Sequence, residues 1–218
     1  MLVYAVRHGE SEANIGQFYS GHLDVGLSEK GNEDAEKAGE LLRGITFDKI
    51  YSSDLKRAIH TCEIAIPGSM PIQTALLREI DVGNLMGRKW SECREEGGEA
   101  FNEALKLRAF KDFGGETREE HRTRVAEFLM SLEALCNKTD VEAASKTENA
   151  RVAVFCHNGT ILRMIETVCG PDSSEGLKIR NCEICIFEYR DGVWSFKGTL
   201  YDEDKDAKST NEQLNEER

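Results

Sequence analysis

Four side chains that could carry out chemistry follow four predicted strands. His8 comes after the apolar run at residues 2–6, and Arg57, Glu79 and His157 each follow a later apolar run. An imidazole can act as a nucleophile, a carboxylate can carry a proton, and a guanidinium keeps its positive charge. In open α/β sheets, ligands bind beyond the carboxyl ends of the strands. We therefore expect these four residues to lie together at one edge of a sheet.

The segment Arg7-His8-Gly9 places a basic residue, the imidazole and a glycine directly after the first strand. Glycine permits a close approach of the backbone to a neighbour. Taken alone, this triplet has a simpler interpretation, a histidine that packs or hydrogen-bonds at the end of a strand, because short motifs often occur by chance. The case for a site therefore depends on the other candidates as well.

Strands and helices alternate along the chain. Apolar runs predict strands, and small or apolar residues at helical spacing predict the helices between them. The strands are expected at residues 2–6, 48–52, 71–77 and 151–156. The helices are expected from Ser28 to Gly44, from a cap at Ser53 or Asp54 through residue 65, at 125–135 and at 161–168. This order predicts an α/β fold, a three-layer sandwich in which helices flank a largely parallel central sheet.

Three further segments complete the predicted organisation. Residues 83–115 are interrupted by glycines and partly helical, which indicates a small inserted helical cap. Residues 182–198 are expected to form a hairpin with a turn at Asp191-Gly192. Residues 202–218 carry seven acids, three bases and few large apolar side chains. We expect them to be an acidic, disordered tail behind a single domain at residues 1–201.

The composition narrows the class of partner. The formal charge of −12 argues against nucleic acid, whose backbone requires a basic surface. It does not argue against a small anion, because a local group of arginines can outweigh the distant surface field. No apolar run approaches the roughly 20 residues of a membrane helix, and the N-terminal residues lack the features of a signal peptide. We expect a cytoplasmic protein without a membrane partner, and the sequence leaves its oligomeric state open.

The seven cysteines are odd in number and show no paired framework. Cys182 and Cys185 have CxxC spacing within a segment that we expect to be a strand. Residues three apart on a strand point to opposite faces, which disfavours a redox pair or a metal clip. We expect reduced, structural thiols, as is usual in the cytosol.

Five motifs resemble those of the histidine phosphatase superfamily, the phosphoglycerate mutase-like proteins. They occur in the family's order and span most of the chain. They are Arg7-His8-Gly9-Glu10-Ser11-Glu12-Ala13-Asn14, Ser20-Gly21-His22-Leu23-Asp24 with Leu27-Ser28-Glu29-Lys30-Gly31, Ser52-Ser53-Asp54-Leu55-Lys56-Arg57, Leu77-Arg78-Glu79-Ile80-Asp81-Val82-Gly83, and His157-Asn158-Gly159.

The resemblance implies a phosphohistidine mechanism. A neutral His8 attacks phosphorus in line, which divides one difficult displacement into two easier steps. Glu79 is implied to protonate the leaving oxygen and then to deprotonate the attacking water. Donors for the phosphoryl oxygens are implied at Arg7, Arg57 and His157, and substrate contacts at Asn14, Ser20, Gly21 and Asn158. The arginines should also keep His8 unprotonated. Two alternatives stay open, namely that Glu79 forms a salt bridge with an arginine at the same rim and that His157 orients a loop.

The resemblance favours a phosphatase over a mutase. Val82 stands where mutases have a tyrosine after the acid, and the paired arginines of the mutase cap are not recognisable between residues 87 and 115. Gly114-Gly115-Glu116-Thr117, followed by Arg124-Val125 and Phe128-Leu129, resembles the phosphatase branch instead. Asn158 replaces the usual glycine after the second histidine. We therefore expect a phosphomonoester hydrolase that acts on a small phosphorylated metabolite.

Other functions stay open as alternatives. The first is a cofactor-dependent phosphoglycerate mutase, which would need priming by bisphosphoglycerate, and the second is an inactive module that binds a phospho-ligand or serves as a scaffold. A metallophosphatase is disfavoured because the sequence has no HExxH motif and two pocket arginines would repel a cation. We therefore expect no metal or other cofactor. In the cap, Arg88 and Lys89 either reach the substrate or lie on a solvated face.

Overall fold

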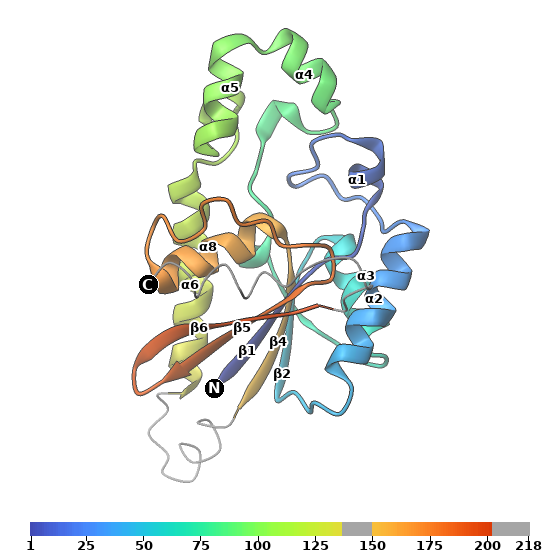
Figure 1. The fold of residues 1–218 in the computed structure, drawn as a ribbon, viewed down its shortest axis with the longest axis vertical. Helices are drawn as coiled ribbons and strands as arrows, with labels where there is room; N and C mark the ends of the chain where they lie inside the picture. Colours follow the sequence, from blue (N-terminus) through green and yellow to red (C-terminus); the bar gives the residue numbers. More distant parts are fainter. Residues whose placement is uncertain (137–149, 202–218) are drawn as a thin grey trace.

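The computed structural model describes residues 1–136 and 150–201 of the chain. Its strands form a six-stranded sheet in the order β3-β2-β4-β1-β5-β6 (Figure 1). The pairs among β1, β2, β3 and β4 are parallel, whereas β5 runs antiparallel to β1 and β6 antiparallel to β5. The bounds are β1 Leu2–Arg7, β2 Lys49–Ser53, β3 Ile72–Thr74, β4 Arg151–Cys156, β5 Ile184–Arg190 and β6 Val193–Leu200. The predicted α/β fold with a largely parallel sheet is confirmed.

Helices cover both faces of this sheet. The α-helices are α1 Glu12–Gly16, α2 Glu29–Leu42, α3 Lys56–Ala65, α4 Trp90–Glu96, α5 Gly98–Leu107, α6 Arg118–Cys136 and α8 Asn158–Cys169. Short 3-10 turns lie at η1 Ala75–Leu77, η2 Gly83–Leu85 and η3 Lys111–Phe113. The hydroxyl of Ser28 caps α2 by accepting from the amide of Gly31 at 3.0 Å, as the sequence predicts.

The alternation of side chains along β1 explains the three layers. Val3 and Ala5 are buried in the cluster with α6 and α8, while Tyr4 and Val6 are buried in the cluster with α2 and α3. A central strand of a parallel sheet is covered on both faces, so its sequence is a continuous apolar run. The run at residues 2–6 therefore indicated both the strand and its position within the sheet.

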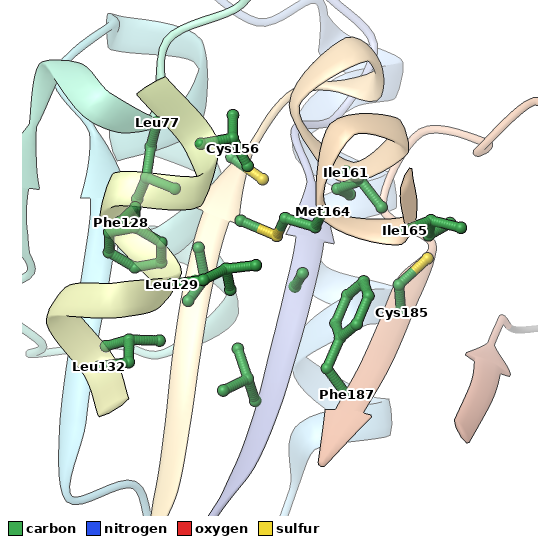
Figure 2. Packing of buried hydrophobic residues seen from close by; sticks show 14 of the residues in the cluster. Leu77, Phe128, Leu129, Leu132, Cys156, Ile161, Met164, Ile165, Cys185 and Phe187 are labelled. Atoms are coloured by element: carbon green, nitrogen blue, oxygen red, sulfur yellow. The ribbon is translucent and has the colours of Figure 1, made fainter. Parts of the chain in front are cut away.

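The larger apolar cluster lies between the sheet and the helices α6 and α8 (Figure 2). Phe128, Leu129 and Leu132 project from α6, and Ile161 and Met164 from α8, toward the strands. Fully burying a side chain of this size contributes about 1.5–3 kcal/mol. This packing fixes the carboxyl end of β4, where α8 begins.

The helices α4 and α5 stand beyond the carboxyl edge of the sheet (Figure 1). They belong to residues 83–115, where the sequence predicts a helical cap, and they have a separate apolar cluster that includes Leu85, Phe101 and Phe110. Among the described residues, no helix is both long and apolar enough to cross a membrane.

The structure corrects several boundaries. Helix α3 starts at Lys56 behind Leu55, so neither Ser53 nor Asp54 is its cap residue. The run at residues 71–77 contains only a three-residue strand and then the turn η1, because only three residues pair with β2. Cys182 lies before β5 with a left-handed backbone (φ 58°), so our argument from strand periodicity was wrong for the CxxC pair.

The hairpin of β5 and β6 is confirmed. The cysteines whose side chains the structure describes are free thiols, and they are Cys62, Cys93, Cys156, Cys169, Cys182 and Cys185. The predicted tail at residues 202–218 lies outside the described residues.

Candidate active site

The four candidate side chains meet at the carboxyl edge of the sheet. His8 follows β1, Arg57 lies in the first turn of α3 behind β2, and His157 follows β4. The rings of His8 and His157 have their centroids 5.2 Å apart. Arg57 Nε donates to His157 Nδ1 at 3.2 Å, and the carboxylate of Glu79 accepts from the amide of Gly159, next to that loop, at 3.0 Å. The expected meeting of these residues at one edge is confirmed.

A single hydrogen bond sets the orientation of His8. Its Nδ1 lies 2.7 Å from the carbonyl oxygen of Gly9. A carbonyl oxygen can only accept, so we assign the proton to Nδ1, and this leaves Nε2 with a free lone pair. The ring therefore has the tautomer that a nucleophilic Nε2 requires.

The surroundings of His8 also favour the neutral ring. Burial lowers the pKa of His8 well below its usual value, and the positive charges of Arg57 and Arg7 lower it further. The arginines act in the direction that the sequence predicts, but burial is the larger cause. His8 therefore stays unprotonated at neutral pH.

Close backbone packing holds the loop that carries His8. The amide of Gly9 donates to the hydroxyl of Thr61 on α3 at 3.0 Å. A Cβ atom on Gly9 would lie only 2.3 Å from the carbonyl oxygen of Gly31, at the start of α2. Since real Cβ atoms are not found at that distance, only glycine fits between His8 and this helix. The side-chain amide of Asn181, which is far from His8 in the sequence, donates to the backbone carbonyl of His8 at 2.9 Å and also holds this loop.

Arg57 and the half-buried Arg7 have only part of their donors in use. Arg57 is fully buried, and it donates to His157, to the carbonyl of Leu23 and to the carbonyl of Gly21. A guanidinium has five N–H groups, so two remain after these three bonds. Arg7 donates from Nη1 to the carbonyl of Ile179, whereas its buried Nε has no acceptor among the described residues.

Burial lowers the pKa of both arginines, to about 10 for Arg57. Both side chains stay charged at neutral pH. Unused N–H groups on buried, charged arginines suit the oxygens of a phosphoryl group.

Both ring nitrogens of His157 are occupied. Arg57 Nε can only donate, so Nδ1 of His157 accepts, and the proton on Nε2 is then directed to the hydroxyl oxygen of Ser53 at 2.9 Å. Burial, with Arg57 second, lowers the pKa of His157 well below its usual value, which agrees with a neutral ring. In this arrangement His157 holds Arg57 in place, and it could donate to a phosphoryl oxygen only after exchanging Ser53.

Glu79 is held by backbone donors. Its Oε1 accepts from the amide of Ile80 at 2.9 Å, and its Oε2 from the amide of Gly159 at 3.0 Å. A carboxylate has about four lone-pair positions, so half remain for other partners. Among the described residues no arginine forms a salt bridge with this carboxylate, in contrast to the alternative considered from the sequence. A Cβ on Gly159 would lie 2.1 Å from Oε1, so any larger residue there would displace this carboxylate.

A half-buried ion pair supports the backbone of Glu79, and sequence reasoning gave it no role. Arg124 Nη1 donates to the carbonyls of Ala75, Leu76 and Arg78, while Nη2 donates to the carbonyl of Glu79 at 3.2 Å. Arg124 also binds both carboxylate oxygens of Glu116, one of which accepts from the amide of Asp81 at 3.0 Å. Both residues lie in segments that resemble the phosphatase branch, and that resemblance was the available signal.

His22 also binds this backbone. Its Nε2 lies 2.8 Å from the carbonyl oxygen of Glu79, and its Nδ1 lies 3.7 Å from the carboxylate of Asp81. The ring therefore helps to hold the segment that carries Glu79.

A cavity of about 540 Å³ reaches this edge of the sheet through Glu79 and Gly21. Asn14 and Ser20 also line it, as expected for substrate contacts, although Asn14 Oδ1 accepts from the amide and hydroxyl of Ser11. Asn158 does not line it, and its amide oxygen instead accepts from the amide of Ile179 at 3.1 Å.

The cap bases singled out from the sequence point elsewhere. Arg88 forms a salt bridge with Glu96, and Lys89 Nζ donates to the carbonyl of Gly16 at 2.7 Å. The cap bases that do line the cavity are Arg94 and Arg108.

Comparisons with known proteins show what this chain is similar to. A family model for the histidine phosphatase superfamily (branch 1) matches residues 3–200. A 2,3-bisphosphoglycerate-dependent phosphoglycerate mutase from Streptococcus thermophilus is 44% identical over 105 residues, which cover 45% of this chain and 45% of that protein. The matched segment thus spans less than half of that relative.

Two solved structures share the fold over most of their length. Phosphoglycerate mutase from Bacillus anthracis str. Sterne superimposes with a TM-score of 0.74 at 25% identity, covering 90% of this chain and 91% of that one. Alpha-ribazole phosphatase from Shigella flexneri has a TM-score of 0.77 at 21% identity, covering 90% and 95%. At that identity, the second likeness shows the fold alone.

Proposed function

The chain belongs to the histidine phosphatase superfamily, and from this premise we propose that it is a phosphomonoester hydrolase that forms a phosphohistidine on His8. The observation that carries the proposal is the free Nε2 of a buried, neutral His8 beside two charged arginines that have N–H groups to spare. The substrate is a small phosphorylated metabolite, and the enzyme works in the cytoplasm without a metal.

In the proposed first step, His8 Nε2 attacks phosphorus in line with the leaving oxygen. Negative charge spreads over the three equatorial oxygens, and donors fixed beforehand on Arg7 and Arg57 stabilise it. Glu79 delivers a proton to the leaving oxygen as the P–O bond breaks. In the second step, Glu79 takes a proton from water, which attacks the phosphohistidine and releases inorganic phosphate and the neutral imidazole.

The side chain at position 82 favours hydrolysis over a mutase reaction. Val82 lines the cavity, so the residue that stands in place of the expected mutase tyrosine faces the substrate. Phosphoglycerate mutase, with bisphosphoglycerate priming, is the second candidate, and the 44% identity to a mutase over 105 residues supports it. A scaffold role is disfavoured because the catalytic candidates are all present at one edge of the sheet.

Phosphate release should exceed isomerisation. We expect the purified protein to release inorganic phosphate from phosphomonoesters in a metabolite panel, and to interconvert 2- and 3-phosphoglycerate slowly even with added 2,3-bisphosphoglycerate. The measurement is phosphate release beside a coupled mutase assay on the same preparation. Faster isomerisation than hydrolysis would assign the protein to the mutases.

Activity should survive exhaustive chelation, because Arg7 and Arg57 supply the positive charge that a metal would otherwise bring. Among the described residues, no group of three His, Cys, Asp or Glu side chains is placed to hold a metal ion. Vanadate, which can take a five-coordinate geometry like that of phosphorus in the transition state, should inhibit strongly. Loss of activity with EDTA and its return with zinc or magnesium would instead support a metallophosphatase.

A further inference from the structure

The cavity has an unusual charge for this protein. The chain carries a formal charge of −12, yet the described residues that line the cavity include three cations, Arg94, Arg108 and Lys178, and a single acid, Glu79. Arg94 comes from α4, Arg108 follows α5, and Lys178 lies between α8 and β5. Three separate segments thus bring positive charge to one space.

Within the part of the chain that the structure describes, these three cations have no acidic partner, whereas several nearby cations do. Around them, Arg88 pairs with Glu96, and Lys111 pairs with Glu120. Farther along, Arg118 and Arg122 are also paired with glutamates. By contrast, no acid of the described residues lies within salt-bridge distance of Arg94, Arg108 or Lys178. The cations that line the cavity are therefore left without a carboxylate partner among the described residues.

Aromatic side chains line the same cavity as these cations. Tyr19, Trp90 and Phe110 line the same cavity, and the rings of Tyr19 and Trp90 pack edge to face with centroids 6.4 Å apart. The charges of Arg94 and Arg108 both act on the hydroxyl of Tyr19, where they oppose the rise in its pKa that burial causes. Arg94 and Arg108 therefore line one cavity together with these aromatic side chains.

We propose, resting on the phosphatase function above, that the substrate is a phosphomonoester with a second anionic group, separated from the phosphoryl group by an apolar or ring-shaped body. The phosphoryl group lies at His8, Arg7 and Arg57, and the body packs on Tyr19, Trp90 and Phe110. Arg94, Arg108 and Lys178 bind the distal carboxylate or phosphate. A volume of about 540 Å³ suits a small molecule of this kind.

The distal charge also explains why an acidic protein needs these residues. The overall field of the molecule repels an anion, and local unpaired cations reverse that field where the substrate enters. A neutral sugar phosphate would use only the phosphoryl contacts, and the three cations would add nothing to its binding. The substrate is therefore distinguished by its second charge.

Matched aryl phosphates test this proposal. The probes are 4-carboxyphenyl phosphate and 4-carbamoylphenyl phosphate, with the corresponding biphenyl pair as a longer version. Each pair has the same shape and differs in the distal charge, and the amide has the better leaving group. We expect kcat/KM to favour the carboxylate by about tenfold or more in at least one pair, which corresponds to about 1.4 kcal/mol, and the preference to fall as salt is added.

Variants assign that preference to the cations. Arg94→Gln combined with Arg108→Asn should bring the ratio of carboxylate to carboxamide close to one, and asparagine suits the left-handed backbone of residue 108 (φ 52°). Arg94→Lys should retain the preference, and Arg43→Gln, which removes an exposed arginine paired with Glu40 on α2, should not change it. Circular dichroism verifies that each variant is folded.

Two results would overturn the proposal while leaving the phosphatase function intact. One is equal turnover of both members in both pairs, and the other is an unchanged preference in the folded double variant. A protein that hydrolyses none of the four probes, nor phenyl phosphate, would instead contradict the phosphatase function itself.

Discussion

His8→Ala should lose phosphoenzyme formation completely and reduce turnover by about 10⁴-fold or more, since removal of a covalent nucleophile typically has an effect of that size. The reason is chemical. Phosphoryl transfer passes through Nε2, and none of the neighbouring side chains offers a comparable lone pair at that position. His157, whose ring lies 5.2 Å away, has both nitrogens bonded to Arg57 and Ser53 and cannot take over.

The intermediate can be trapped directly. A ³²P-labelled substrate is mixed with enzyme and quenched in denaturing alkali, because a phosphohistidine survives base and is lost in acid. The wild-type protein and His60→Ala, which removes an exposed histidine of α3, should both retain label, and His8→Ala should not. Thermal unfolding verifies that the variant is folded. A His8→Ala protein that is fully active, or that still carries base-stable label, would rule out the proposed nucleophile.

The meeting of His8, Arg57 and His157 at one edge could be predicted because strand order imposes it. Parallel strands end at the same edge, and each of these residues follows a parallel strand closely. The apolar runs that indicated the strands come from burial on both faces, which leaves a strong signal in the sequence. Burial and topology together thus made most of the fold predictable from the sequence.

Details that depend on loop geometry could not be predicted in the same way. Arg124 acts on four backbone carbonyls at residues 75–79, and nothing in those residue types indicates it. Similarly, Arg88 and Lys89 were the cap bases that the sequence singled out, but Arg94 and Arg108 line the cavity. Which bases line it depends on the turns around α4 and α5, and short glycine-interrupted segments have no clear periodicity.

The hydrogen bonds to both ring nitrogens of His157 are another feature visible only in three dimensions. Its motif is that of a phosphate-binding histidine by resemblance, yet here it accepts from Arg57 and donates to Ser53. The bonding observed in this structure is that of a residue that holds the Arg57 side chain, a role that differs from the loop-orienting alternative considered from the sequence. Its direct contact with a phosphoryl group stays a prediction.

Glu79→Gln should slow phosphoenzyme formation more for substrates with a poor leaving group than for substrates with a good one. An alkyl phosphate needs its leaving oxygen protonated, so removing a general acid should cost about 100- to 10,000-fold in its phosphoenzyme formation. A nitrophenolate departs without a proton, and the loss for 4-nitrophenyl phosphate should be much smaller in that step. Dephosphorylation by water should suffer for both substrates, because they share the same phosphoenzyme and the same need for a base.

The dependence on the leaving group distinguishes the loss of a general acid from a shift of the loop at Gly159. Both oxygens of Glu79 accept backbone N–H groups, so the amide of a glutamine loses one of these bonds and could shift Gly159 as well. A shifted loop would slow both esters alike, whereas the loss of an acid slows the alkyl ester selectively. Rapid-quench burst kinetics give phosphoenzyme formation apart from its hydrolysis, so each step can be compared between the two esters.

The same experiment identifies the proton donor if that residue is not Glu79. Asp81 accepts from the amide of Gly83 at 2.8 Å, Glu10 accepts from the hydroxyl of Ser28 at 2.9 Å, and neither lines the cavity. We therefore expect Asp81→Asn to lack the selective loss with the alkyl ester. Equal slowing of phosphoenzyme formation by Glu79→Gln for both esters, together with selective slowing by Asp81→Asn or Glu10→Gln, would transfer the role of proton donor to that residue.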